Sequence, residues 1–117
     1  MRKFKKFEIW SQGIQIVKDV YRFSELLPAQ EKFGLRSQIT RASVSIPSNI
    51  AEGASRNSDI EFKRFLEIAL GSLFELETQL IIIEELKLVR NFNFQFLFKS
   101  IEKEAKMINS FISKLKN

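Results

Sequence analysis

The sequence predicts an all-α fold, an antiparallel up-down four-helix bundle. Four stretches place apolar residues at steps of three and four, which is the spacing of one helix face. No stretch alternates apolar and polar residues for long, as a half-buried strand does. Only short turns separate the four stretches, and short connections favour antiparallel neighbours. With 117 residues, the chain is expected to form a single bundle domain over residues 1–117.

The first predicted helix covers residues 9–27 and ends before Pro28, a residue that commonly follows a helix terminus. A second apolar row lies beside its main row, so its apolar face is wider than a surface helix needs. The main row consists of Ile9, Ile16, Val20, Phe23 and Leu27, and the second of Trp10, Ile14, Val17 and Tyr21.

The second predicted helix runs from Leu35 to Gly53. Pro47 lies inside it, where proline removes a backbone hydrogen bond and costs about 3 kcal/mol. We expect a kinked helix in which Pro47 lies away from the core row, and the alternative is a break at Ile46. The core row is Leu35, Ile39, Ala42, Ile46 and Ile50. A polar stripe on the neighbouring face contains Gln38, Arg41, Ser45, Asn49, Glu52 and Arg56.

The third predicted helix starts at Ser58, which stands before Glu61 in the S-x-x-E spacing of a capping box, and continues to about Leu86. Gly71 and Ser72 in its middle are expected to let a neighbouring helix approach closely. The fourth runs from residue 94 to residue 115, after a turn whose asparagines can cap it. Some apolar residues lie off the main rows: Phe74, Ile82, Phe92, Phe96 and Met107. They favour self-association, and the alternative is that they are single exposed side chains.

The composition excludes several kinds of chemistry. Cysteine and histidine are absent, which removes disulfides, thiol nucleophiles, histidine acid–base catalysis and the usual zinc sites. The glutamates of the third helix are expected to form a solvated acidic face and not a metal site. We therefore expect a protein with no metal, no cofactor and no enzymatic activity. No apolar run of signal-peptide or membrane-spanning length occurs, which predicts a cytoplasmic protein with no membrane partner.

Positive charge is concentrated at both ends of the chain. Residues 1–30 hold six basic and three acidic residues, and residues 88–117 hold six and two. Residues 58–87 hold three and seven, so this part alone is acidic. Basic surfaces attract phosphate groups, and nucleic acid is therefore a candidate partner.

Two sets of residues are candidates for contacts with nucleic acid. Arg41 and Arg56 of the polar stripe can bind phosphate, although the helical spacing favours a hydrogen-bonded network between helices or subunits. That network would include Gln38, Ser45, Asn49 and Glu52. The basic N-terminus interleaves Lys3, Lys5 and Lys6 with Phe4 and Phe7, a pattern that can hold a nucleic-acid backbone and stack a base. The alternative is a solvated tail in which Phe7 docks on the first helix.

A family resemblance rests on two segments, "GLRSQITRASVSIPSNIAEGASRNS" and "EFKRFLEIALGSLFELETQL", together with Trp10 and the turn "LLPAQEKFGL". The chain resembles the four-helix bundle proteins encoded in intervening sequences of bacterial 23S rRNA genes, also labelled S23 ribosomal protein. This resemblance implies a homo-oligomeric ring, a pentamer, and an association with RNA. It attaches no catalytic role to any motif position. Gln12 and Gly13 depart from the pattern, because a helix-favouring residue is expected there.

We therefore expect a non-enzymatic, oligomeric bundle protein that associates with RNA through basic surfaces. The alternative is a structural scaffold or adaptor that binds a protein partner through exposed apolar surface.

Overall fold

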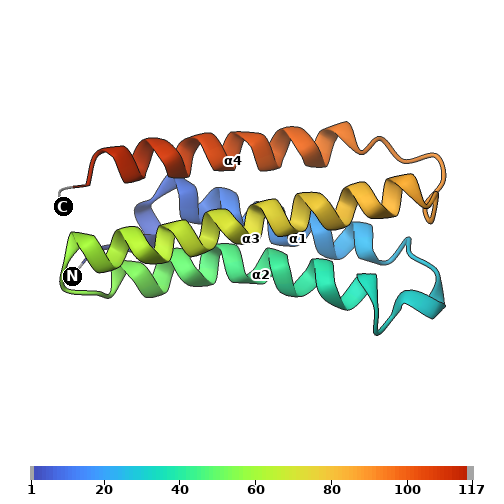
Figure 1. Cartoon of the computed structure of the whole chain (residues 1–117), viewed down its shortest axis with the longest axis horizontal. Coiled ribbons are helices and arrows are strands. Elements are labelled where there is room, and N and C mark those ends of the chain that lie inside the picture. Colours follow the sequence, from blue (N-terminus) through green and yellow to red (C-terminus); the bar gives the residue numbers. More distant parts are fainter. Residues whose placement is uncertain (1, 116–117) are drawn as a thin grey trace.

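The computed structural model describes residues 2–115 and has four long helices in an elongated bundle of 45 × 24 × 20 Å (Figure 1). The helices are α1 (Glu8–Ser24), α2 (Leu35–Ala54), α3 (Asp59–Glu85) and α4 (Gln95–Ser113). Two short 3₁₀ helices, η1 (Phe4–Lys6) and η2 (Ala29–Glu31), precede α1 and α2. Residues 2–115 contain no strand, and the all-α prediction is confirmed.

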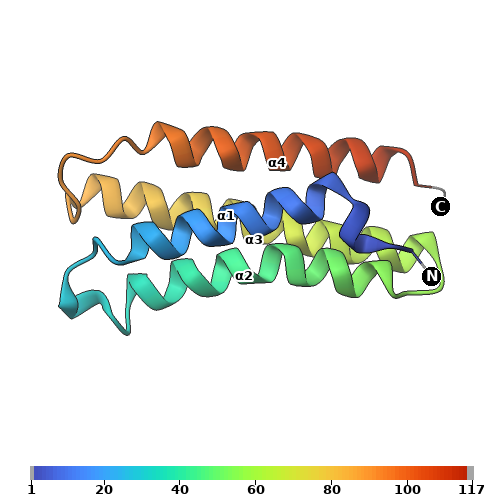
Figure 2. The ribbon, with the colours of Figure 1, turned by 180° about the vertical axis from the view of Figure 1, so that it is seen from behind.

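Successive helices run in opposite directions, so the start of α1 and the end of α4 lie at the same end of the bundle (Figures 1 and 2). Helix α1 packs against α2 and α4, and α3 also packs against α2 and α4. The pairs α1/α3 and α2/α4 are therefore diagonal. Helices α2 and α3 pack most closely, whereas α4 is more loosely attached. The predicted up-down bundle is confirmed.

The core consists of the predicted apolar rows, one from each helix. On α3, Phe62, Leu66, Leu73 and Leu76 are fully buried. The other helices contribute Ile16, Val20, Ile39, Ile46, Ile50, Ile101 and Ile108 to the same cluster. Burial of a large apolar side chain stabilises the fold by roughly 1.5–3 kcal/mol, so these rows hold the four helices together. None of the described helices is both long and apolar enough to cross a membrane.

Helix α2 continues through Pro47 without interruption, so the alternative break at Ile46 does not occur. The expected orientation of Pro47 is wrong, because the residue is buried instead of lying away from the core. Its ring faces α1 at Gly13. A Cβ atom on Gly13 would lie only 3.3 Å from the Cβ of Pro47, so glycine at position 13 allows the two helices to approach.

The predicted cap of α3 is present, whereas the N-cap residue of α4 is Phe94 and makes no side-chain cap hydrogen bond. The Glu61 amide donates to the Ser58 hydroxyl over 3.2 Å, and the Gln95 amide donates to Asn93 Oδ1 over 3.0 Å. Ser72 lies at the close α2–α3 contact, where its Oγ is 2.6 Å from that of Ser45. Gly71 does not meet the expectation of close approach within the bundle, because a Cβ atom there would have no atom of another described helix within 4 Å. The side of α3 that contains Gly71 faces outward.

Candidate nucleic-acid interface

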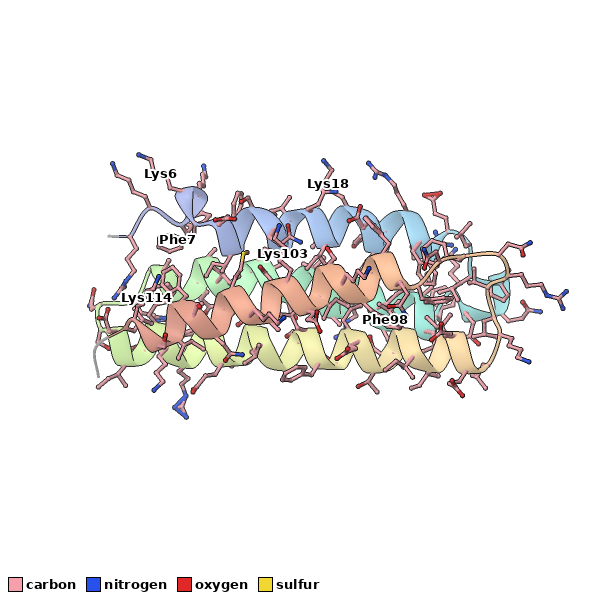
Figure 3. The ribbon with its side chains drawn as sticks, turned by 90° about the horizontal axis from the view of Figure 1, so that it is seen from above. Lys6, Phe7, Lys18, Phe98, Lys103 and Lys114 are labelled. Atoms are coloured by element: carbon pink, nitrogen blue, oxygen red, sulfur yellow. The ribbon has the colours of Figure 1, made fainter. Side chains whose placement is uncertain are left out.

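The antiparallel topology brings the two basic ends of the sequence side by side, because α1 and α4 are neighbours (Figure 3). Their exposed side chains form a surface that we call the basic face. It contains Lys18, Arg22, Lys99, Lys103, Lys106 and Lys114. The three lysines of α4, Lys99, Lys103 and Lys106, lie on its exposed side, away from the buried residues Leu97, Ile101 and Ile108, and Lys114 directly follows the helix.

Acidic residues neutralise the basic face only in part. Arg22 is 3.7 Å from Asp19, and Lys106 is 3.9 Å from Glu102. Both basic side chains are largely exposed, and such pairs contribute little because water and salt screen them. The remaining lysines of the face have no ion-pair partner among residues 2–115. The face therefore keeps most of its positive charge for an external anion.

The N-terminal segment extends this charge at one end of the bundle. Arg2 fixes the segment: its Nη1 donates to the carbonyl of Arg56 over 2.6 Å, and its Nη2 bonds Asp59 Oδ1 over 2.6 Å. The guanidinium also lies 4.6 Å from the centre of the Phe62 ring. The segment is thus a docked part of the fold, and its sequence-predicted candidates Lys3, Lys5 and Lys6 are all exposed.

The two aromatic rings of the segment pack on the bundle. Phe4 makes an edge contact with Trp10 at 5.4 Å, so the contact with the first helix comes from Phe4. Phe7 stacks on Phe62 of α3 at 6.0 Å and meets Phe111 of α4 edge-on at 5.0 Å. The expected docking of Phe7 therefore occurs mainly on α3 and α4.

The arginines of the polar stripe lie apart from each other. Arg56 is at the same end as the N-terminal lysines, where it pairs with Glu52 over 3.0 Å and lies 4.9 Å from the centre of the Phe65 ring. Arg41 is fifteen residues earlier in the chain, which corresponds to roughly 20 Å along the helix axis. It is exposed at a small cleft with Glu75 and Gln79 of α3. The structure therefore groups Arg56, but not Arg41, with Lys3, Lys5 and Lys6.

The other residues of the stripe form mostly local contacts. Asn49 donates to the carbonyl of Ser45 over 2.7 Å, within the same helix. Ser45 reaches another helix through Ser72, and Gln38 is exposed beside Arg41 at the cleft. Within one subunit, the bond between the Ser45 and Ser72 hydroxyls thus connects this stripe to α3. A network between subunits remains a prediction.

Sequence reasoning missed Glu104, a buried acidic residue of α4. The side chain is fully buried, and neither carboxylate oxygen has a hydrogen-bond partner in the described chain. Burial raises the pKa of this carboxyl from 4.5 to about 8, and nearby Lys103 lowers it to a smaller extent. The signal was present in the sequence, because position 104 lies at core spacing between Ile101 and Ile108.

No group of three or more histidine, cysteine, aspartate or glutamate side chains able to hold a metal ion occurs among the described residues. A sequence model of the 23S rRNA-intervening sequence proteins matches residues 5–110. No curated protein matches the chain. Among solved structures, the chain is similar to a protein of unknown function from the S23 ribosomal protein family of Bacteroides thetaiotaomicron. The TM-score is 0.82 with 21% sequence identity, over 91% of this chain and 96% of that chain, which shows a shared fold.

Proposed function

Because the chain belongs to the family of 23S rRNA-intervening sequence proteins, we propose that it binds RNA through the basic face and the N-terminal lysines, without catalysing a reaction. The observation that carries this proposal is the joining of two basic chain ends, distant in sequence, into one surface. An RNA-associated role would place the protein in the cytoplasm.

The physical basis is electrostatic. Lysine side chains that contact phosphates release the counterions that surround a nucleic acid, and this release drives binding. Helix α4 has 19 residues, which corresponds to roughly 28 Å and allows its lysines to follow several phosphates along a backbone. Lysines on two neighbouring helices read the position of phosphates rather than base identity. Binding through this face is therefore expected to depend on RNA shape more than on sequence.

A salt series tests the proposal. Purified protein is titrated with a structured ribosomal RNA fragment and with duplex DNA of equal length. We expect micromolar or tighter affinity for the RNA at physiological salt, a preference for RNA, and a linear fall of log K with log salt concentration. Binding that is weak for both ligands and disappears at physiological salt would contradict the proposal.

The outer side of α3 supports a second proposal, that copies of the chain associate through it. Phe74 is 53% exposed there, and Ile60, Ile81 and Ile82 are exposed on the same side. Gly71 lies between them, with open space where a side chain would be. Glycine inside a helix costs about 1 kcal/mol relative to alanine. Close approach by a helix of another copy would explain why glycine stands at position 71. The family resemblance implies that such an assembly is a ring of five. The adaptor hypothesis uses the same surface for a different protein.

A further inference from the structure

A groove lies at the end of the bundle where the N-terminal segment meets the last turns of α4. It has a volume of about 580 Å³ and lies between residues 6–9 and residues 106–115. Phe7, Ile9, Met107, Phe111 and Leu115 provide its apolar lining. Lys6, Lys106 and Lys114 surround this lining, and Figure 3 shows Lys6, Phe7 and Lys114 at this end of the molecule.

We propose that this groove takes one unpaired nucleobase of a bound single-stranded RNA, with the flanking phosphates on its lysines. The proposal rests on the RNA-binding function proposed above and specifies the kind of RNA segment that this end of the molecule would contact. Duplex regions keep their bases stacked inside the helix, so only an unpaired base can enter a groove of this kind.

The lining is suited to a flat aromatic group. Phe7 is held by its contacts with Phe62 and Phe111, yet Phe7 and Phe111 are both only half-buried. Their rings are therefore fixed in place before any ligand binds, which reduces the conformational entropy that is lost on binding. Stacking of a base on an aromatic side chain contributes about 1–3 kcal/mol and depends little on which base is present.

The charges select an anionic occupant. Lys6 and Lys114 have no ion-pair partner within residues 2–115, and the pair of Lys106 with Glu102 is long and exposed. Glu8 is the acidic residue in the lining. An apolar surface ringed by three lysines fits a molecule that combines an aromatic group with negative charge, as a nucleotide does. Lys3 and Lys5 precede Lys6 in the chain and are exposed.

The first test uses the scarcity of methionine. The chain holds two methionines, so methyl-labelled methionine gives at most two protein signals, and Met107 reports directly on the groove. The probe is a short RNA of adenosine and cytidine, which cannot pair with itself. We expect a saturable shift of the Met107 methyl signal with this RNA and a much smaller shift with duplex RNA at equal phosphate concentration. A response of Met107 to anionic lipid vesicles, together with none to RNA, would overturn the proposal.

A pair of variants supplies the second test. Met107→Glu places a negative charge in the groove, and Leu26→Glu places the same charge on an exposed site of the chain near the opposite end of the bundle. Circular dichroism first checks that both fold. We expect Met107→Glu to weaken single-strand binding at least tenfold more than Leu26→Glu does, with equal, small effects on duplex RNA. Equal losses for the single strand would overturn the groove but leave RNA binding by the basic face intact. No RNA binding by the unsubstituted protein would overturn both proposals.

Discussion

The backbone of Gly13 in α1 packs against the ring of Pro47 in α2. A Cβ atom at position 13 would lie 3.3 Å from the Cβ of Pro47 and 3.4 Å from its Cδ, and 3.3 Å from Oε2 of Glu104. Three helices therefore meet at one residue that has no side chain. The proline ring, which lacks an N–H, is buried at this contact.

This contact predicts that Gly13 and Gly71 respond to substitution with opposite signs. Gly13→Leu should lower the free energy of unfolding by about 1–3 kcal/mol, because it overpacks a filled interior. Gly71→Ala should raise it by about 0.5–1 kcal/mol, because the site is open and alanine favours the helix. Urea denaturation at a concentration at which all three proteins are monomeric measures both, because Gly71 then has no contact with another copy. Destabilisation of equal size by both changes would contradict the close packing of Gly13 against Pro47.

Glu104 predicts a specific pH dependence of stability. Burial raises its pKa to about 8 in the folded protein, against 4.5 as the ordinary value. Between these values the folded state holds a proton that the unfolded chain releases. The stabilisation that comes from this bound proton is therefore complete below about pH 4.5 and is lost as the pH rises through 8. Over this range the free energy of unfolding falls by at most about 1.4 kcal/mol per pH unit.

Glu104→Gln isolates this effect, because glutamine has a similar shape and does not titrate. We expect the free energy of unfolding of the variant, minus that of the unsubstituted protein, to increase steadily from about pH 5 to about pH 8. Urea denaturation at several pH values measures the difference, in which the contributions of all other groups cancel. A difference that stays constant over this range would show that Glu104 does not have a raised pKa.

The contacts of Arg2 predict that this side chain anchors the start of the N-terminal segment, ahead of the docked rings of Phe4 and Phe7. Arg2→Ala removes the bonds to the Arg56 carbonyl and Asp59 and the contact with the Phe62 ring. We expect a loss of about 1 kcal/mol, kept small because the ion pair is partly exposed, and faster proteolysis near the N-terminus. Lys3→Ala removes a neighbouring exposed side chain and serves as control. Equal protease sensitivity of the two variants would contradict the anchoring role.

The outer side of α3 predicts a response of the assembly state. Phe74→Glu should shift the protein towards monomers at a fixed concentration, because a charge in an apolar interface is costly to desolvate. Phe33→Glu makes the same change at a loop residue that is 89% exposed and should leave the assembly unchanged. Size-exclusion chromatography with light scattering gives the mass of each variant. An unsubstituted protein that is already monomeric would contradict self-association.

The fold could be predicted from the sequence because its signals are local. Ser58 and Asn93 mark helix starts through short-range hydrogen bonds, and the apolar rows indicate which side of each helix is buried. Contacts between helices were harder to predict from the sequence. Gly13 and Pro47 each stand out in the sequence, but only the packing of α1 on α2 shows that the two residues explain each other.

The candidate site was predictable in part for the same reason. The charge of the chain ends is visible in the sequence, whereas their union into one face depends on α4 lying beside α1. The packing of Phe7 on Phe62 and Phe111 joins three distant segments and could not be derived from spacing. Glu104 was predictable in principle, because it occupies a core position in an otherwise apolar row.

Two matched triple variants test the proposed binding of RNA by the basic face most directly. One replaces Lys18, Lys99 and Lys103 of the basic face with glutamine, and the other replaces Lys32, Lys63 and Lys87, which lie outside it. Both remove the same net charge. We expect the first variant to bind the ribosomal RNA fragment at least tenfold more weakly, with a salt dependence shallower by about one unit for each phosphate that its lysines no longer bind. The second should keep the slope of the unsubstituted protein. Equal changes in affinity and slope for the two variants would contradict binding through this face.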